Sequence, residues 1–210
     1  MAFAVAHDLR QPLMAALLAL DGLQTVPQPR LAEGHGLIRA SIVEALDRIR
    51  ALLDLAGLER RELVPTDLDL RALALGAIER LSAVHADAPV SWQVRGTATV
   101  EADPTMVSLV LGNLLENAIV HGCADPARPI TVKVVIEPAG EGALVSVEDD
   151  GVGVDAELEG RLFTAFTKSA RHEGTGLGLS TSLRAARRCG GDLRYSRVEP
   201  HGSRFGLLLP

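Results

Sequence analysis

Two glycine-containing segments in the second half of the chain combine residue types that could bind a nucleotide. In the first, Asp149 is followed by Gly151 and Gly153, which allow the backbone to approach a ligand closely. A carboxylate accepts hydrogen bonds, so Asp149 could bind the exocyclic amino group of adenine, whereas guanine has no donor at that position. The alternative interpretation of this segment is a simple hairpin turn.

The second segment reads Gly174-Thr175-Gly176-Leu177-Gly178-Leu179-Ser180 and opens a predicted helix. The free N–H groups and the dipole at a helix N-terminus favour phosphate. The segment follows a polar loop and not a strand, and its spacing matches neither the dinucleotide fingerprint nor the P-loop. Any phosphate binding here therefore depends on neither of those motifs.

The stretch between the two segments, residues 162–173, has the composition of a mobile lid. It carries Lys168, Arg171 and His172, and cations there could neutralise phosphate charge. A lid of small and polar residues can close over a nucleotide and open again. The alternative is an ordinary solvated surface loop.

Asn113 and Asn117 lie four residues apart in a predicted helix, so their side chains share one face. An amide oxygen is a hard, uncharged ligand, and a Mg²⁺ ion that bridges phosphates commonly takes only one or two protein oxygens. The pair therefore suggests a magnesium site. The structural alternative is a pair of buried asparagines that bridge helices.

His7 is a candidate nucleophile near the start of the chain. Imidazole has an unperturbed pKa of about 6.5, so near neutral pH one ring nitrogen can attack phosphorus. Asp8 could hold the proton of the other nitrogen and fix the tautomer. Pro12 removes a backbone donor and predicts a kink beside the histidine. Without this context, a lone histidine on an amphipathic helix is usually an ordinary surface or core residue.

The elements that would carry His7 form a predicted helical hairpin. Residues 2–21 show apolar side chains at helical spacing, and residues 21–30 form a loop with Gly22, Pro27 and Pro29. A second amphipathic helix follows around residues 38–53. Two helices alone bury too little apolar surface, so the hairpin should pair with a second copy as a four-helix bundle. We therefore expect a homodimer.

Downstream of Pro65 the pattern changes to alternating helices and short strands, which predicts an α/β sandwich over one mixed sheet. The fold class is thus α+β, with a hairpin domain over residues 1–63 and a ligand-binding domain over residues 64–210. The expected helices cover residues 70–85, 104–121 and 176–189, and the expected strands cover residues 131–136, 143–149, 192–197 and 204–209.

Composition excludes several classes of protein. The net charge of −6 comes without a basic cluster, so nucleic acid is not an expected partner. Cys123 and Cys189 are too few for a disulfide framework and lack metal-site spacing, which suits a reducing cytosol. The apolar run 13–20 is too short to span a bilayer and lacks signal-peptide flanks. We therefore expect a cytoplasmic chain without a membrane segment.

These motifs, in this order, resemble those of the bacterial sensor histidine kinases along almost the entire chain. The acceptor segment of that family resembles residues 7–13, and its asparagine box resembles residues 113–118. Its first glycine box resembles residues 149–153, its phenylalanine box residues 163–166 and its second glycine box residues 174–178. Five motifs in order are far more specific than any one of them.

The resemblance implies a dimerisation and phosphotransfer hairpin followed by a Bergerat-type ATP-binding domain, the fold shared with Hsp90 and type II topoisomerase ATPases. It implies ATP and Mg²⁺ as cofactors and the receiver domain of a response regulator as partner. By carry-over, Asn117 would bind Mg²⁺, Asn113 and Lys168 would lie near phosphates, Asp149 would contact adenine, and Glu116 would help to activate the histidine. Gln11 departs from the Thr or Asn that many relatives use for phosphatase activity, so phosphatase activity is not predicted.

Two alternatives stay open at this point. One is a phosphotransferase of the same architecture that relays phosphate without using ATP, which the intact asparagine and glycine boxes disfavour. The other is a clamp-type ATPase of the Bergerat group, which needs no acceptor histidine and usually has a much longer lid.

Overall fold

The computed structural model describes residues 61–122, 129–167 and 176–210, and a few single residues nearer the N-terminus. The chain divides into two compact units, Met1–Arg61 and Glu62–Pro210. The predicted hairpin lies outside the described residues except for those single positions, which are helical: Met14, Ala16, Leu18, Ile38, Arg39, Ser41, Ile42 and Ala45.

The second unit contains the helices and strands that position the candidate site. Its helices are α3 (Leu70–Val84), α4 (Pro104–Gly122), α5 (Ala156–Glu159) and α6 (Gly178–Arg188). Its strands are β1 (Thr66–Asp69), β2 (Val90–Gly96), β3 (Thr99–Ala102), β4 (Ile130–Ala139), β5 (Gly142–Asp149), β6 (Asp192–Arg197) and β7 (Ser203–Leu209).

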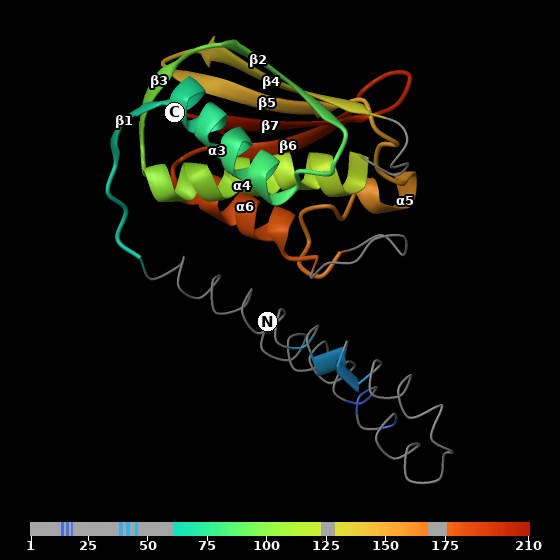
Figure 1. Ribbon diagram of the computed structural model, residues 1–210. Helices are drawn as coiled ribbons and strands as arrows, with labels where there is room; N and C mark the ends of the chain where they lie inside the picture. Colours follow the sequence, from blue (N-terminus) through green and yellow to red (C-terminus); the bar gives the residue numbers. More distant parts are fainter. Residues whose placement is uncertain are drawn as a thin grey trace. The chain divides into compact units, whose positions relative to one another are not determined.

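The main sheet is mixed, as expected, and has the strand order β2-β4-β5-β7-β6. Strands β2 and β4 pair in parallel, and every other neighbouring pair in this sheet is antiparallel. Strands β1 and β3 form a separate two-stranded antiparallel sheet. Helices α3, α4 and α6 lie against one face of the main sheet, which makes the two-layer α/β sandwich visible in Figure 1.

The core lies between that sheet and those helices. Strand β4 alternates between buried Val132 and Val134 and the exposed Lys133, the pattern of a strand with one face covered. Helix α4 buries apolar residues along nearly its whole length, including Leu111 and Leu114. Aliphatic side chains fill the core, which agrees with an aromatic content of only 3%.

The helices and strands predicted from residue 64 onwards are present at nearly the predicted bounds. Three strands were not predicted: β1, β2 and β3. β2 is an edge strand whose residues are only half-buried or exposed, so it lacks the clear apolar alternation that marked β4. β1 and β3 have four residues each, too short for a distinct period.

Among the described residues, no helix is long and apolar enough to cross a membrane.

Candidate functional site

Asp149 is the last residue of β5, and its side chain is buried at 8% exposure. Burial raises the pKa of Asp149 to about 6, although hydrogen bonds from the backbone amides of Gly151 and Ser203 oppose the shift. Its Oδ1 atom accepts the hydrogen bond from the Gly151 amide at 3.0 Å. The hairpin-turn alternative for this segment is wrong, because β5 is followed by an irregular loop and helix α5.

Gly151 allows this loop to pack directly against the end of α4. A Cβ atom at Gly151 would lie 2.4 Å from Cα of Gly122 and 2.9 Å from Oδ1 of Asp149. Gly122 is the last residue of α4 and is itself buried. Only a glycine therefore allows the loop to lie this close to both the helix and the carboxylate.

Gly153 brings the same loop against the turn between β6 and β7. It has a positive φ of 74°, and a Cβ atom there would lie 3.1 Å from the carbonyl oxygen of Gly202. Nδ1 of His201, in the same turn, lies 3.1 Å from the carbonyl oxygen of Asp150. A carbonyl only accepts, so Nδ1 is the donor in this contact. The first glycine segment is thus held between α4 and the β6–β7 turn.

Helix α6 begins at Gly178, inside the second glycine segment. Asn113 of α4 donates from its amide nitrogen to the carbonyl oxygen of Gly178 at 3.2 Å and to the hydroxyl of Ser182 at 3.0 Å. The alternative in which the asparagines bridge helices therefore holds for Asn113. The first turn of α6 contains no acidic residue, which suits an anion near its N-terminus.

Asn117 lies one helical turn beyond Asn113 and is half-buried. Its side-chain amide has no hydrogen-bond partner among the described residues. Nor do these residues bring three or more His, Cys, Asp or Glu side chains together as a metal centre. One free amide oxygen fits Mg²⁺ that takes its remaining ligands from phosphate and water, and does not fit an all-protein metal site.

Phe166, inside the predicted lid, is hydrogen-bonded to Gly176, three residues beyond its end. The amide of Phe166 donates to the carbonyl oxygen of Gly176 at 2.9 Å. Both residues have positive φ, 65° at Phe166 and 67° at Gly176, and a Cβ atom at Gly176 would lie 2.8 Å from the carbonyl carbon of Phe166. A non-glycine residue in this conformation is strained, so the surrounding contacts must hold Phe166 in place.

Helix α4 is the element that joins the two glycine segments. The side chain of Asn113 in this helix donates a hydrogen bond to the start of α6, and the last residue of the helix, Gly122, packs against Gly151. At 1.5 Å per residue these two points lie about 14 Å apart along the helix axis. Asn117 lies between them on the same helix. The arrangement spans the length of an extended nucleotide, with a carboxylate at one end and a helix N-terminus at the other.

Several predicted site residues lie outside the described residues: His7, Asp8, Lys168, Gly174 and Thr175. Glu116 is described, and its side chain on α4 is 53% exposed. Its Oε1 atom lies 3.9 Å from Nε2 of His85, which is the C-cap of α3.

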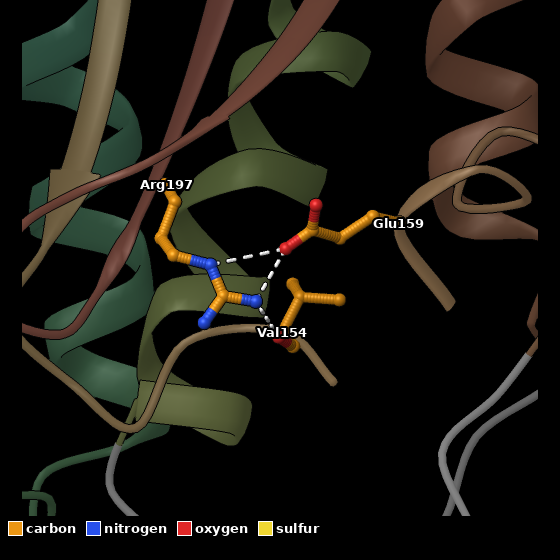
Figure 2. Close-up of polar contacts among 3 residues, drawn as sticks. All are labelled: Val154, Glu159 and Arg197. Atoms are coloured by element: carbon orange, nitrogen blue, oxygen red, sulfur yellow. Dashed lines mark hydrogen bonds and ion pairs between the residues drawn. The ribbon is translucent and has the colours of Figure 1, made fainter. Parts of the chain in front are cut away.

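Sequence reasoning did not find Gly122, His201 or Gly202, nor the contact of Arg197 with Val154, which directly follows the first glycine segment. The dipeptide His201-Gly202, in a turn between two strands, was the sequence signal that could have pointed to His201 and Gly202. Figure 2 shows the Arg197 contact, in which the guanidinium reaches both Glu159 of α5 and the carbonyl of Val154. Neither partner is near Arg197 in sequence, and no local pattern marks the pair.

Comparison with known proteins decides the family. Residues 102–210, from the end of β3 to the C-terminus, match the model of the histidine kinase-, DNA gyrase B- and HSP90-like ATPases. The chain belongs to this ATPase family. The matched residues include both glycine segments and all of α4, so the geometry described above lies within the ATPase-family match.

Sensor histidine kinases are similar to this ATPase-family chain over its whole length. The chain is 33% identical to the sensor histidine kinase ZraS of Escherichia coli O157:H7, over 100% of this chain and 45% of that protein. It thus spans about half the length of the curated relatives it matches. The resemblance to the histidine kinase transmitter core, inferred from the motifs, is confirmed.

Solved structures show the same fold. The histidine kinase ThkA, in complex with the response regulator protein TrrA, has a TM-score of 0.75 at 20% identity and is matched over 100% of this chain and 61% of that one. Full-length ShkA in complex with AMPPNP has a TM-score of 0.66 at 23% identity, over 99% of this chain and 44% of that one. At these identities the likeness concerns the fold alone.

Proposed function

We propose that this ATPase-family chain is a protein-histidine kinase that uses ATP to phosphorylate His7 and passes the phosphoryl group to an aspartate of a response regulator receiver domain. The observation that carries the proposal is the geometry of α4, which bonds to the start of α6 through Asn113 and packs against the Asp149 loop through Gly122. One helix thereby sets the spacing between an adenine-binding carboxylate and a phosphate-binding helix N-terminus.

The nucleotide-binding roles follow from this placement. The carboxylate of Asp149 accepts the amino group of adenine, and Gly151 and Gly153 let the loop lie close to the ring. Asn113 sits near the phosphates and holds the start of α6. The remaining phosphate contacts come from one cation and the second glycine segment, namely Lys168, Gly174, Thr175, Gly176, Leu177 and Gly178.

The metal role is assigned to Asn117, whose amide oxygen would hold Mg²⁺ against the phosphates. When bound, Mg²⁺ supplies charge neutralisation on the phosphate oxygens. Asn117 is half-buried and its amide has no protein partner among the described residues, so its oxygen is available for this role.

The acceptor chemistry is assigned to His7, Asp8 and Glu116. A neutral ring nitrogen of His7 attacks the γ-phosphorus, a P–N bond forms, the bond to the β–γ bridging oxygen breaks, and ADP leaves. Asp8 holds the proton on the other ring nitrogen and offsets the positive charge that develops there. The side chain of Glu116 is 53% exposed, so its carboxylate is accessible for this role.

The proposal includes a homodimer formed by the hairpin of residues 1–63. Among the few described residues of this region, three large apolar side chains are well exposed in the single chain: Met14 at 48%, Leu18 at 66% and Ile42 at 43%. Pairing with a second copy would remove them from water, as in a four-helix bundle. The use of ATP and of a response regulator would place the reaction in the cytoplasm.

The decisive experiment is incubation of the chain with γ-labelled ATP, followed by separate acid and base treatments of the protein. A phosphohistidine loses its label in acid and keeps it in base. His7→Gln should carry no label, whereas the matched control His35→Gln should be labelled like the wild type. Label that survives acid, or that persists in His7→Gln, would overturn the histidine-kinase assignment.

A second arm separates the alternative functions. A relay protein would show no saturable affinity for Mg-ATP, and a clamp ATPase would hydrolyse ATP without acid-labile label on the protein. The variant Asn117→Ala should lose Mg²⁺-dependent labelling. Unchanged labelling of this variant would remove Asn117 from the metal role.

A further inference from the structure

Arg197, at the end of β6, connects three elements around the first glycine segment (Figure 2). Its Nε atom donates to Oε1 of Glu159 at 3.1 Å, and its Nη2 atom donates both to that oxygen and to the carbonyl oxygen of Val154, the latter at 3.1 Å. Glu159 ends α5, and Val154 directly follows Gly153. A single guanidinium thus joins β6, α5 and the glycine loop.

The loop has little backbone support of its own at this point. Residues 150–155 form no helix or strand, and Gly153 adopts positive φ. Among the described residues, no backbone N–H donates to the Val154 carbonyl, so the Arg197 side chain supplies the hydrogen bond that this carbonyl receives. The orientation of this peptide group therefore depends on a side chain from a strand distant in sequence.

The same hairpin also contacts the beginning of the loop. His201 Nδ1 lies 3.1 Å from the carbonyl oxygen of Asp150, and a Cβ atom at Gly202 would lie 2.1 Å from the carbonyl oxygen of Asp149. The hairpin of β6 and β7 therefore holds one end of the loop through its turn and the other end through Arg197.

We propose that Arg197 is a positioning residue for nucleotide binding: by fixing Val154 and α5, it holds Gly151–Gly153 in the conformation that receives the adenine. This proposal rests on the proposed use of ATP. A guanidinium presents its donors in a rigid planar fork, so it can fix two acceptors at once in a way that a lysine cannot. Exposed ion pairs contribute little to stability, so loss of the Arg197 contacts should weaken nucleotide binding and leave the free energy of unfolding nearly unchanged.

The test measures the affinity of the full chain for ATP, ADP and adenosine in Arg197→Ala, Arg197→Lys and a matched control. Arg197→Ala should weaken all three ligands by a common factor of about five, the size expected when one intramolecular hydrogen bond is lost. The same factor is expected for ATP, ADP and adenosine because all three contain adenine, and the loop is proposed to contact the adenine. Arg197→Lys should recover only part of the loss.

The control is Arg194→Ala, on the same strand, which removes an exposed arginine paired with Asp192 at 3.4 Å and should leave all three affinities unchanged. If Arg197→Ala fails to fold, Glu159→Ala removes the carboxylate acceptor of the fork and should weaken the binding of all three ligands equally by a smaller factor. Unchanged affinity in folded Arg197→Ala, or a loss confined to ATP, would overturn the positioning role. If the wild type binds no nucleotide, the proposed function fails and this inference fails with it.

Discussion

Asp149 illustrates how a proposed binding residue can oppose folding. Its carboxylate is buried at the end of β5, and burial raises its pKa to about 6 from an ordinary value of 3.8. The folded chain therefore binds a proton at Asp149 more tightly than the unfolded chain does, and stability falls as pH rises from about 4 through 6. The buried charge is a cost to folding, and in the proposed function the adenine amino group would offset it by donating to the carboxylate.

The first prediction concerns stability. Asp149→Asn should raise the free energy of unfolding at pH 8 by about 2–3 kcal/mol, because the amide carries no charge to desolvate and can still accept from Gly151. At pH 4 the advantage should be largely lost, since the wild-type carboxyl is then protonated in the folded state. Urea denaturation at both pH values measures this difference. An Asp149→Asn variant that is less stable than wild type at pH 8 would contradict it.

The second prediction concerns binding. The adenine amino group donates a stronger hydrogen bond to the ionised carboxylate than to the protonated acid, so the affinity of the wild type for ATP should fall as pH drops below about 6. Isothermal titration between pH 5 and 8 would show this. Asp149→Asn, which cannot titrate, should bind weakly at every pH, while Asp67→Asn on the distant strand β1 should follow the wild-type profile. A flat wild-type profile would exclude Asp149 as the adenine contact.

Among the elements, α4 contacts both glycine segments, and a loop glycine that packs against it has very different surroundings from a glycine within it. Gly151 packs on the last residue of this helix, where an added Cβ atom would lie 2.4 Å from Cα of Gly122. Gly112, in the middle of α4, has no atom within 4 Å of an added Cβ. The loop therefore approaches the C-terminal end of α4 closely at Gly151, whereas Gly112 has room for a side chain.

The third prediction uses this pair of glycines. Gly151→Ala should destabilise the chain by about 1–3 kcal/mol through overpacking against backbone, and should weaken ATP binding by moving the loop off α4. Gly112→Ala should stabilise it by about 0.5–1 kcal/mol, because alanine restricts the unfolded chain and fits the helix. Thermal melts and ATP titrations of both variants test the contrast. Equal effects of the two substitutions would show that the close approach at Gly151 is not required.

At the scale of the whole molecule, the chain consists of two compact units, and only the second contains the ATPase-family match. The proposed kinase reaction needs both units, because its acceptor, His7, is in the first and its proposed ATP site is in the second. Leu18, at 66% exposure, and Ile42, at 43%, would be buried if two hairpins paired. Assembly, and not folding of the second unit, is therefore expected to depend on these side chains.

The fourth prediction tests that separation. Leu18→Glu should convert a dimer to a monomer, because a charge at a buried helix–helix interface is strongly disfavoured, and should leave the affinity for ATP unchanged. Val84→Glu, which replaces an apolar side chain 75% exposed in the second unit, should remain dimeric. Light scattering measures the mass of each variant. A wild-type chain that is monomeric at micromolar concentration would contradict the dimer proposal.

The sequence by itself determined the features that depend on neighbouring residues. The strand before Asp149, the glycine pattern after it, and the helical spacing of Asn113 and Asn117 all follow from local periodicity and from the φ values that glycine permits. The edge strand β2 was missed because half-buried residues give no clear alternation.

Tertiary structure decided the features that join residues far apart in the chain. Asn113 bonds to Gly178 across 65 positions, and Arg197 bonds to Val154 across 43. Such contacts depend on how helices and strands pack, and packing brings groups together without any local signal in the sequence. The same holds for the raised pKa of Asp149, because the desolvation that causes it comes from the whole core around the end of β5.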